Sequence, residues 1–115
     1  MITVQVCYKP SSFHPDEMGE IVDTVERAIV NSHWGSAPNI YVQPVKNFER
    51  QSTDLVVNVW NYWQTFTVIV ALEAALKKVL RGNQTVFISG QKYLDYHEST
   101  LQGESQTEIN ATTTA

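Results

Sequence analysis

The hydrophobic pattern of the chain predicts four strands. Apolar and polar residues alternate over Ile2–Tyr8 and again over Asp54–Trp60, which is the period of a half-buried strand. Shorter apolar segments at Ile40–Val45 and Thr85–Ser89 predict two more strands. Because Pro44 cannot donate to a sheet ladder, we expect Ile40–Val45 to lie at an edge or to bend there.

A helix over residues 15–33 is predicted by several signals together. Pro15 is favoured at a first helical position, and acidic residues follow it where the helix dipole is positive. Phe13 and Met18 have the spacing of a hydrophobic staple. Apolar residues then recur at helical spacing to Ile29, and Gly35 supplies a stop.

Residues 61–81 are compatible with two structures at first. Asn61 and Gln64 have the spacing of a capping box, whereas the β-branched residues of Thr65–Val70 also suit a strand. The second half favours the helix, because an apolar stripe runs from Ile69 to Leu80 and basic residues precede Gly82. The turn Val68–Ala71 would be apolar nearly all round, so we expect it to be deeply buried or at an interface.

The order β-α-β-β-α-β maps onto a ferredoxin-like α+β sandwich, with two helices on one face of a four-stranded antiparallel sheet. The opposite face would then be uncovered. The strand at Asp54–Trp60 carries apolar residues on both sides, since Val56 and Trp60 oppose Leu55, Val57 and Val59. An uncovered face of that composition is typical of an interface.

Charge divides the chain into two parts. The whole chain has a net charge of −4, from 8 basic and 12 acidic residues. Residues 97–115 contain Glu98, Glu104 and Glu108 and no basic residue, so residues 1–96 hold 8 basic and 9 acidic residues, a net charge of −1. We therefore predict one α+β domain over 1–96 and a polar acidic C-terminal tail over 97–115, too poor in apolar residues to order by itself. The balance supplies no basic face, so duplex nucleic acid is not an expected partner.

The chain shows no sign of export or membrane insertion. Cys7 is the single cysteine, so no intrachain disulfide forms. The N-terminus lacks the features of a signal peptide, and the apolar segment Phe66–Leu72 is far shorter than the ~20 residues that cross a bilayer. We expect a soluble protein of the cytoplasm, of a host-cell cytoplasm or of a virion.

Catalytic and metal-binding motifs are absent from the sequence. No phosphate loop, Rossmann glycine pattern, zinc spacing or nucleophile elbow occurs. His14, His33 and His97 lie at helix ends and at the start of the tail, without the spacing of a metal site. We therefore assign no catalytic residue, metal or cofactor, and read Cys7 as a buried inert thiol.

Aromatic residues form the densest unusual feature. They cluster within a few residues after the third strand, with one more after the first helix: Trp34, Trp60, Tyr62, Trp63 and Phe66. Tryptophan and tyrosine combine a large contact area with a polar group and are enriched at protein interfaces, and they also line ligand pockets. An interface is the favoured interpretation of this aromatic corner, and a ligand pocket is the alternative.

A family resemblance rests on three short pieces. The opening Met-Ile-Thr-Val with Tyr8, the pair Val59-Trp60, and the following helix with Phe66 resemble the antibiotic-biosynthesis-monooxygenase group of dimeric α+β barrels. The resemblance implies two ferredoxin-like subunits that pair their sheets, and in some members haem binding or oxidation of aromatic polyketides. Haem-degrading members carry a histidine on this helix. Residues 61–82 contain none, so only the architecture is carried over.

Three functions follow from these features. The favoured one is a non-enzymatic oligomeric assembly subunit, as found in virus and phage particles, which associates through the apolar sheet face and the aromatic corner and uses its tail as an arm. The first alternative is a small-molecule-binding protein or a cofactor-independent monooxygenase-like enzyme. The second alternative is a regulatory or inhibitory binder of another protein.

Overall fold

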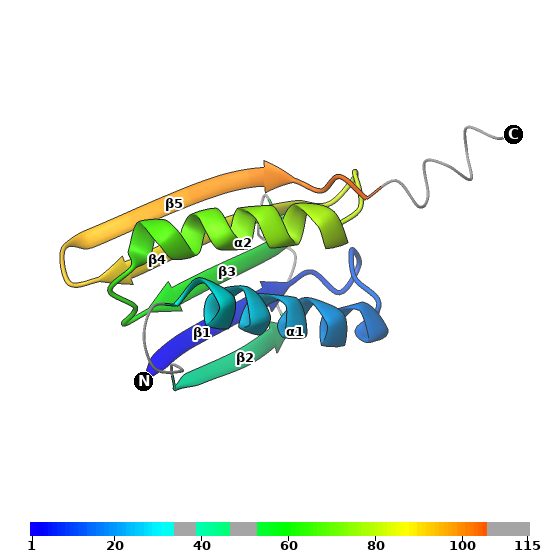
Figure 1. Cartoon of the computed structure of the whole chain (residues 1–115). Coiled ribbons are helices and arrows are strands. Elements are labelled where there is room, and N and C mark those ends of the chain that lie inside the picture. The colour runs from blue at the N-terminus through cyan, green and yellow to red at the C-terminus, as the bar shows by residue number, and fades with distance from the viewer. Residues whose placement is uncertain (34–38, 47–52, 106–115) are drawn as a thin grey trace, which may run out of the picture.

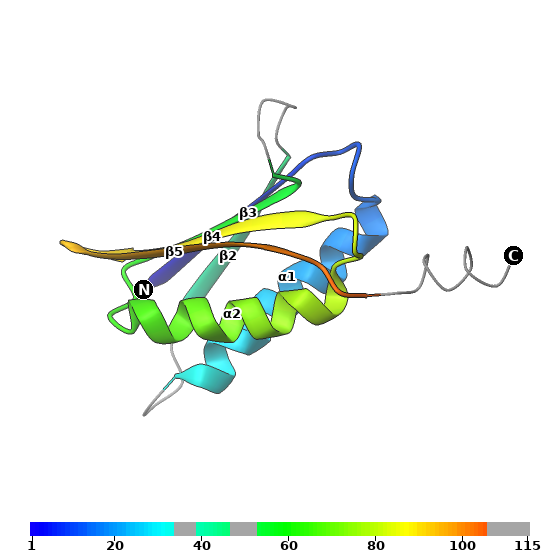
Figure 2. The ribbon, with the colours of Figure 1, turned by 90° about the horizontal axis from the view of Figure 1, so that it is seen from above.

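The computed structural model describes residues 1–33, 39–46 and 53–105. It contains two helices and five strands, which are in chain order β1 (Ile2–Tyr8), α1 (Pro15–Ser32), β2 (Ile40–Lys46), β3 (Leu55–Trp60), α2 (Thr65–Val79), β4 (Thr85–Lys92) and β5 (Asp95–Gln102). The strands form one sheet in the order β2-β1-β3-β4-β5 (Figure 1). Both helices lie on the same side of this sheet (Figure 2).

The sheet is mixed rather than antiparallel. β1 pairs with β2 in parallel and β3 pairs with β4 in parallel, while β1 and β3 at the centre are antiparallel, as are β4 and β5. Each helix therefore connects two neighbouring parallel strands. The prediction of an α+β fold is confirmed, but the ferredoxin-like four-stranded antiparallel sheet is wrong in strand number, order and direction.

The first helix begins as its sequence predicts. His14 is the N-cap, its ring accepts a hydrogen bond from the Asp16 N–H, and Glu17 reaches back to the backbone N–H of His14. Phe13 and Met18 are both buried, as expected for a staple. The predicted stop at Gly35 lies outside the described residues.

The second helix begins later than predicted. It starts at Thr65, with Gln64 as an N-cap that makes no side-chain capping bond, so the predicted capping box at Asn61 is wrong. Asn61 instead has a positive φ of 67° and donates its N–H to the Gln91 carbonyl. The β-branched residues that suggested a strand serve the core here, because Val68 and Ile69 are buried against the sheet.

The core lies between the sheet and the helices. Alternate residues of the central strands are fully buried there, among them Val4, Val6, Leu55, Val57, Val59, Val86 and Ile88. They pack against the apolar stripes of α1 and α2. Burying these side chains is the main stabilising term, at about 1.5–3 kcal/mol for each large one.

The sheet continues past the predicted boundary between body and tail. β5 runs to Gln102, and the chain beyond it is held to the end of α2. Glu104 donates its N–H to the Lys77 carbonyl over 2.8 Å, and Ser105 donates to the Leu80 carbonyl over 2.9 Å. Residues 97–105 therefore belong to the folded body, and the remainder of the predicted tail lies outside the described residues.

Candidate functional site

The face of the sheet opposite the helices is uncovered among the described residues (Figure 2). Strand side chains alternate between the two faces, so the residues between the buried core positions point to this side. The pairing register aligns them in three rows across the sheet. We call this surface the open face.

The rows differ in chemistry. In the sheet order β2 to β5 the aromatic row is Tyr41, Thr3, Trp60, Gln91 and Tyr96; the amide row is Gln43, Gln5, Asn58, Ser89 and Glu98; the apolar row is Val45, Cys7, Val56, Phe87 and Thr100.

The aromatic and apolar rows expose hydrophobic surface. Tyr41 is 51% exposed and Tyr96 47% exposed, while Trp60 and Phe87 are partly exposed. Glu98 is the sole charged side chain within the three rows, although 17% of the chain is charged. Depletion of charge with enrichment in aromatics is the composition of an interface core rather than of a water-facing sheet.

Three side chains of the amide row take part in hydrogen bonds on this face. Ser89 Oγ donates to Asn58 Oδ1 over 2.7 Å, and the Tyr96 hydroxyl donates to Glu98 Oε2 over 2.8 Å. Because Tyr96 loses this bond to the carboxylate when it ionises, the pKa of Tyr96 is raised. Asn58, Ser89 and Glu98 are thus hydrogen-bonded within a single copy.

Cys7 lies in the apolar row but is only 8% exposed. Burial raises the pKa of its thiol, which keeps the unreactive protonated form at neutral pH. The structure therefore gives Cys7 the environment of a packing residue, as the sequence predicted.

The predicted aromatic residues do not form one pocket. Trp60 points to the open face, whereas Tyr62 is buried in the core with 1% exposure. Trp63 and Phe66 are 55% and 62% exposed at the start of α2. Trp34 lies outside the described residues.

Sequence reasoning missed Tyr41, Phe87 and Tyr96 as members of the same surface. Their alternation within the strands was a usable signal for Tyr41 and Phe87. The polar composition around Tyr96 gives no such signal, because it predicts the start of a tail.

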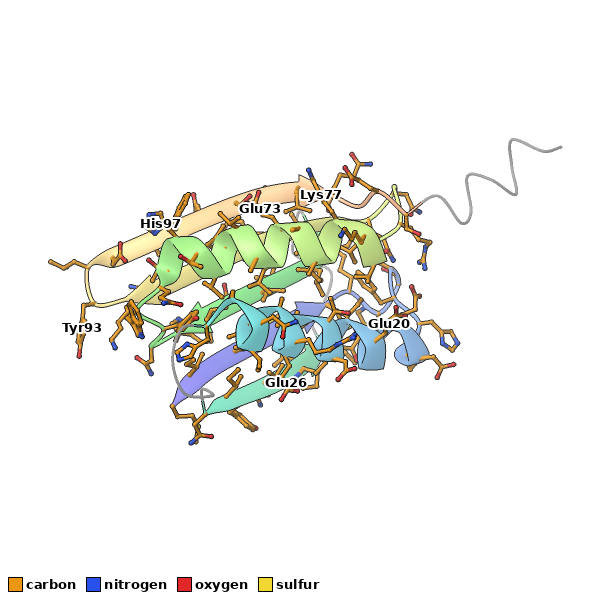
Figure 3. The ribbon with its side chains drawn as sticks, viewed as in Figure 1. Glu20, Glu26, Glu73, Lys77, Tyr93 and His97 are labelled. Atoms are coloured by element: carbon orange, nitrogen blue, oxygen red, sulfur yellow. The ribbon has the colours of Figure 1, made fainter. Side chains whose placement is uncertain are left out.

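A second cluster lies where α2 begins beside β5. The Thr65 hydroxyl donates to Asp95 Oδ2 over 2.5 Å, and His97 Nδ1 lies 3.0 Å from the same Thr65 oxygen. Phe66 meets the edge of the His97 ring at 5.4 Å between centroids. Figure 3 shows His97 on the flank of β5 that faces α2.

This arrangement is not that of a nucleophile with its base. In a hydrolytic triad the histidine lies between the hydroxyl and the carboxylate, so that it can take the hydroxyl proton. Here the Thr65 hydroxyl lies within hydrogen-bond distance of both His97 and Asp95, donates its hydrogen bond to Asp95, and belongs to a residue that is 1% exposed. The cluster fastens the start of β5 to the first turn of α2.

The hollow beside this cluster is small. It has a volume of about 240 Å³ and is lined by Trp63, Gln64, Thr65, Phe66, Thr67, Asp95 and His97. Pockets for drug-sized ligands usually measure about 300–1,000 Å³ and enclose the ligand. An open hollow of this size gives little support to the ligand-pocket alternative.

Tyr62 connects the ends of the two helices. Its hydroxyl donates to Gln64 Oε1 over 2.7 Å and lies 3.1 Å from His33 Nδ1, while the two rings stack. Desolvation by burial raises the pKa of Tyr62, so it stays neutral and hydrogen-bonded. His33 and Tyr62 therefore have a structural role.

Two features are absent from the part of the chain that the structure describes. No group of three histidine, cysteine or acidic residues is placed to hold a metal ion, and no helix is long and apolar enough to span a bilayer. Comparison of the chain with protein-family models, with curated proteins and with solved structures gave no match.

Proposed function

We propose that the chain is a non-enzymatic subunit that assembles with other copies of itself through the open face. The observation that supports the proposal is the composition of that face: two rows of aromatic and aliphatic side chains flank a row of amides, with Glu98 as the single charge. Covering such a surface buries a single charge, and the cost of burying its amides is small where they form hydrogen bonds with the second copy.

When two copies pack face to face through the open face, the three rows of one copy lie on the three rows of the other. A two-fold axis that runs along β3 places each row of one copy over the same row of the other and β2 over β5, so Glu98 lies opposite Gln43 rather than a second Glu98. The amide rows then meet each other, and glutamine and asparagine side chains can both donate and accept. The interface is self-complementary, as a two-fold contact requires.

The experiment is a measurement of solution mass by light scattering over a concentration series. Phe87→Lys places a charge within the apolar row, between Val56 and Thr100, and we expect it to lower the assembled mass. The matched control is Val30→Lys on the outer surface of α1, which changes an apolar residue with 41% exposure on the other side of the molecule. Equal masses for the two variants would contradict the proposal, and so would a wild-type chain that stays monomeric throughout.

Because residues 97–105 belong to the folded body, the part of the predicted arm that remains is residues 106–115. We propose that these residues contribute to the same assembly, and deletion of 106–115 is the variant that tests it. An unchanged mass after this deletion would remove the arm from the proposal without affecting the open face.

A further inference from the structure

The two edges of the sheet differ in their ability to accept another strand. On β2, Pro44 interrupts the backbone donors and Lys46 ends the strand, and both residues are common protections against edge pairing. β5 contains neither proline nor lysine over Asp95–Gln102, and its ladder with β4 has an unbroken register. Within the described part of the chain, β5 is therefore the edge that lacks these protections against a further strand.

The backbone groups that point outward from β5 follow from the ladder. The carbonyls of Thr85 and Gln91 on β4 accept hydrogen bonds from Asp54 and Asn61 on the β3 side. Since backbone groups alternate along a strand, the intervening residues of β4 bond to β5. On β5 the N–H and C=O groups that remain outward belong to Tyr96, Glu98, Thr100 and Gln102.

Two copies of β5 can pair in an antiparallel way about a two-fold axis that lies between them. In one register, all of these outward residues of one copy lie opposite outward residues of the other. With the axis at Ser99, Tyr96 lies opposite Gln102 of the other copy, and Glu98 lies opposite Thr100. An axis at Glu98 would place two glutamates opposite each other, which is destabilising, and an axis at Thr100 would leave Tyr96 unpaired within the strand. The strand is thus complementary to itself in a single favoured register.

The helix beside this edge contacts β5 along one stripe of residues, of which Phe66 is apolar. Phe66 contacts His97, Glu73 Oε2 accepts from Ser99 Oγ over 2.8 Å, and Lys77 lies 3.8 Å from Glu104. Figure 3 shows His97, Glu73 and Lys77 along the flank where α2 meets β5.

Val70 lies on the same stripe, one turn after Phe66. Phe66 is 62% exposed and Val70 is 48% exposed. A neighbouring copy that pairs through β5 would bring its own α2 against this stripe and cover both side chains.

We infer that the β5 edge and the Phe66–Val70 stripe of α2 form a two-fold interface with a second copy of this chain, centred on Ser99. The two sheets become one continuous sheet, with both pairs of helices on one side and both open faces on the other. This interface is distinct from the open face, so it goes beyond the proposed function and leaves that face free for a second contact.

The register is tested by cysteine cross-linking of the full chain under mild oxidation. Ser99→Cys places two thiols opposite each other in a non-hydrogen-bonded pair, where Cα atoms are about 4.5 Å apart and a disulfide can close. Glu98→Cys and Thr100→Cys are the controls, since each thiol would lie opposite a different residue. We expect a covalent dimer for Ser99→Cys and far less for the controls; equal cross-linking of all three, or strongest cross-linking at position 98 or 100, would overturn the register.

The interface itself is tested by the pair Thr100→Pro and Thr100→Val. Proline removes an outward N–H and is tolerated at a strand edge, whereas valine keeps that donor and the β-branch. We expect Thr100→Pro to raise the dimer dissociation constant at least tenfold while its circular dichroism spectrum stays native, and Thr100→Val to behave as wild type. A natively folded Thr100→Pro variant with an unchanged dissociation constant would overturn the inference.

Failure of this inference can be told apart from failure of the proposed function. If Phe87→Lys lowers the mass and Thr100→Pro does not, the open face assembles copies and the β5 edge does not. If Thr100→Pro alone lowers the mass, the edge pairs and the open face has no part in assembly.

Discussion

Substitution of Asp54 should reveal how strongly one carboxylate holds the end of the sheet opposite the aromatic row. Asp54 Oδ1 accepts from Ser12 Oγ over 2.5 Å, and Oδ2 accepts from the Thr85 N–H over 2.8 Å and from Thr85 Oγ1 over 3.1 Å. These bonds join the β1–α1 connection to the starts of β3 and β4. Burial would raise the pKa of this carboxyl, but the bonds from Ser12 and Thr85 and the nearby charge of Lys9 outweigh it, so the pKa of Asp54 is lowered.

The expected magnitude follows from the kind of bond that is lost. A hydrogen bond to a charged group contributes about 1.5–3 kcal/mol and a neutral one about 0.5–1.5 kcal/mol. In Asp54→Asn the amide oxygen can still accept from the Thr85 N–H, and the amide nitrogen can donate to Ser12. The neutral side chain therefore keeps weaker bonds, and we expect a loss of about 2 kcal/mol in the free energy of unfolding at pH 7.

The assay is urea unfolding followed by tryptophan fluorescence at pH 7 and near pH 2. A lowered folded-state pKa means that the stabilisation by Asp54 is present above the ordinary carboxyl range of about 4 and is lost as the pH falls through the folded pKa. The difference between wild type and Asp54→Asn should therefore shrink at the lower pH. A difference of the same size at both pH values would refute the electrostatic reasoning, because it would show that Asp54 contributes through shape alone.

Three further predictions concern the fold. Gly103→Ala should destabilise the fold by about 3 kcal/mol, because a Cβ there would lie 2.3 Å from the Leu80 and Arg81 carbonyl oxygens. Gly19→Ala should stabilise α1 by about 0.5–1 kcal/mol, because a Cβ there meets no atom within 4 Å beyond its chain neighbours and the backbone of its own helix. Thermal melts of the two variants should move in opposite directions. Tyr62→Phe should lose about 1–2 kcal/mol in chemical denaturation, because Gln64 and His33 lose a buried partner; an unchanged midpoint would show that the hydroxyl contributes nothing net. Deletion of residues 97–115 removes most of β5 and should abolish cooperative unfolding in calorimetry, while deletion of 106–115 keeps every described strand; similar melting temperatures for both truncations would contradict the placement of β5 in the folded body.

The helices and inner strands were predictable because their signals are local. The cap, staple and apolar period around Pro15–Ser32 all agree, and the structure follows them. The same holds for Ile2–Tyr8 and for the edge position of the strand with Pro44. Each of these patterns reports which side of an element is buried.

Strand order was not predictable from the same signals. A periodic pattern shows that a residue is buried but not which strand lies beside it. The sequence β-α-β has the same periodicity whether its strands are neighbours, as β1 and β2 are here, or are separated by a third strand, as in a ferredoxin-like sheet. The difference lies in long-range pairing, which leaves no period in the chain.

β5 escaped prediction because it is polar. Leu101 is its single large aliphatic residue, and its outer positions carry the tyrosine, glutamate and threonine of the open face. Its order comes from the tight turn after Lys92, from the ladder with β4, and from bonds to α2 through Thr65 and Glu73. These are contacts with residues distant in sequence, so composition alone indicated a tail.

The ambiguity of Val68–Ala71 now has a physical explanation. Val68, Ile69 and Leu72 are buried in the core. Position 70 lies on another side of the helix, where a helix that faces water is expected to carry a polar residue. Val70 is instead 48% exposed, and it lies beside the β5 edge, which has no proline or lysine to protect it. An exposed apolar residue on α2 and an unprotected edge on β5 are both unusual for a surface that faces water, and they lie along the same flank. A second copy placed across Ser99 would remove both at once.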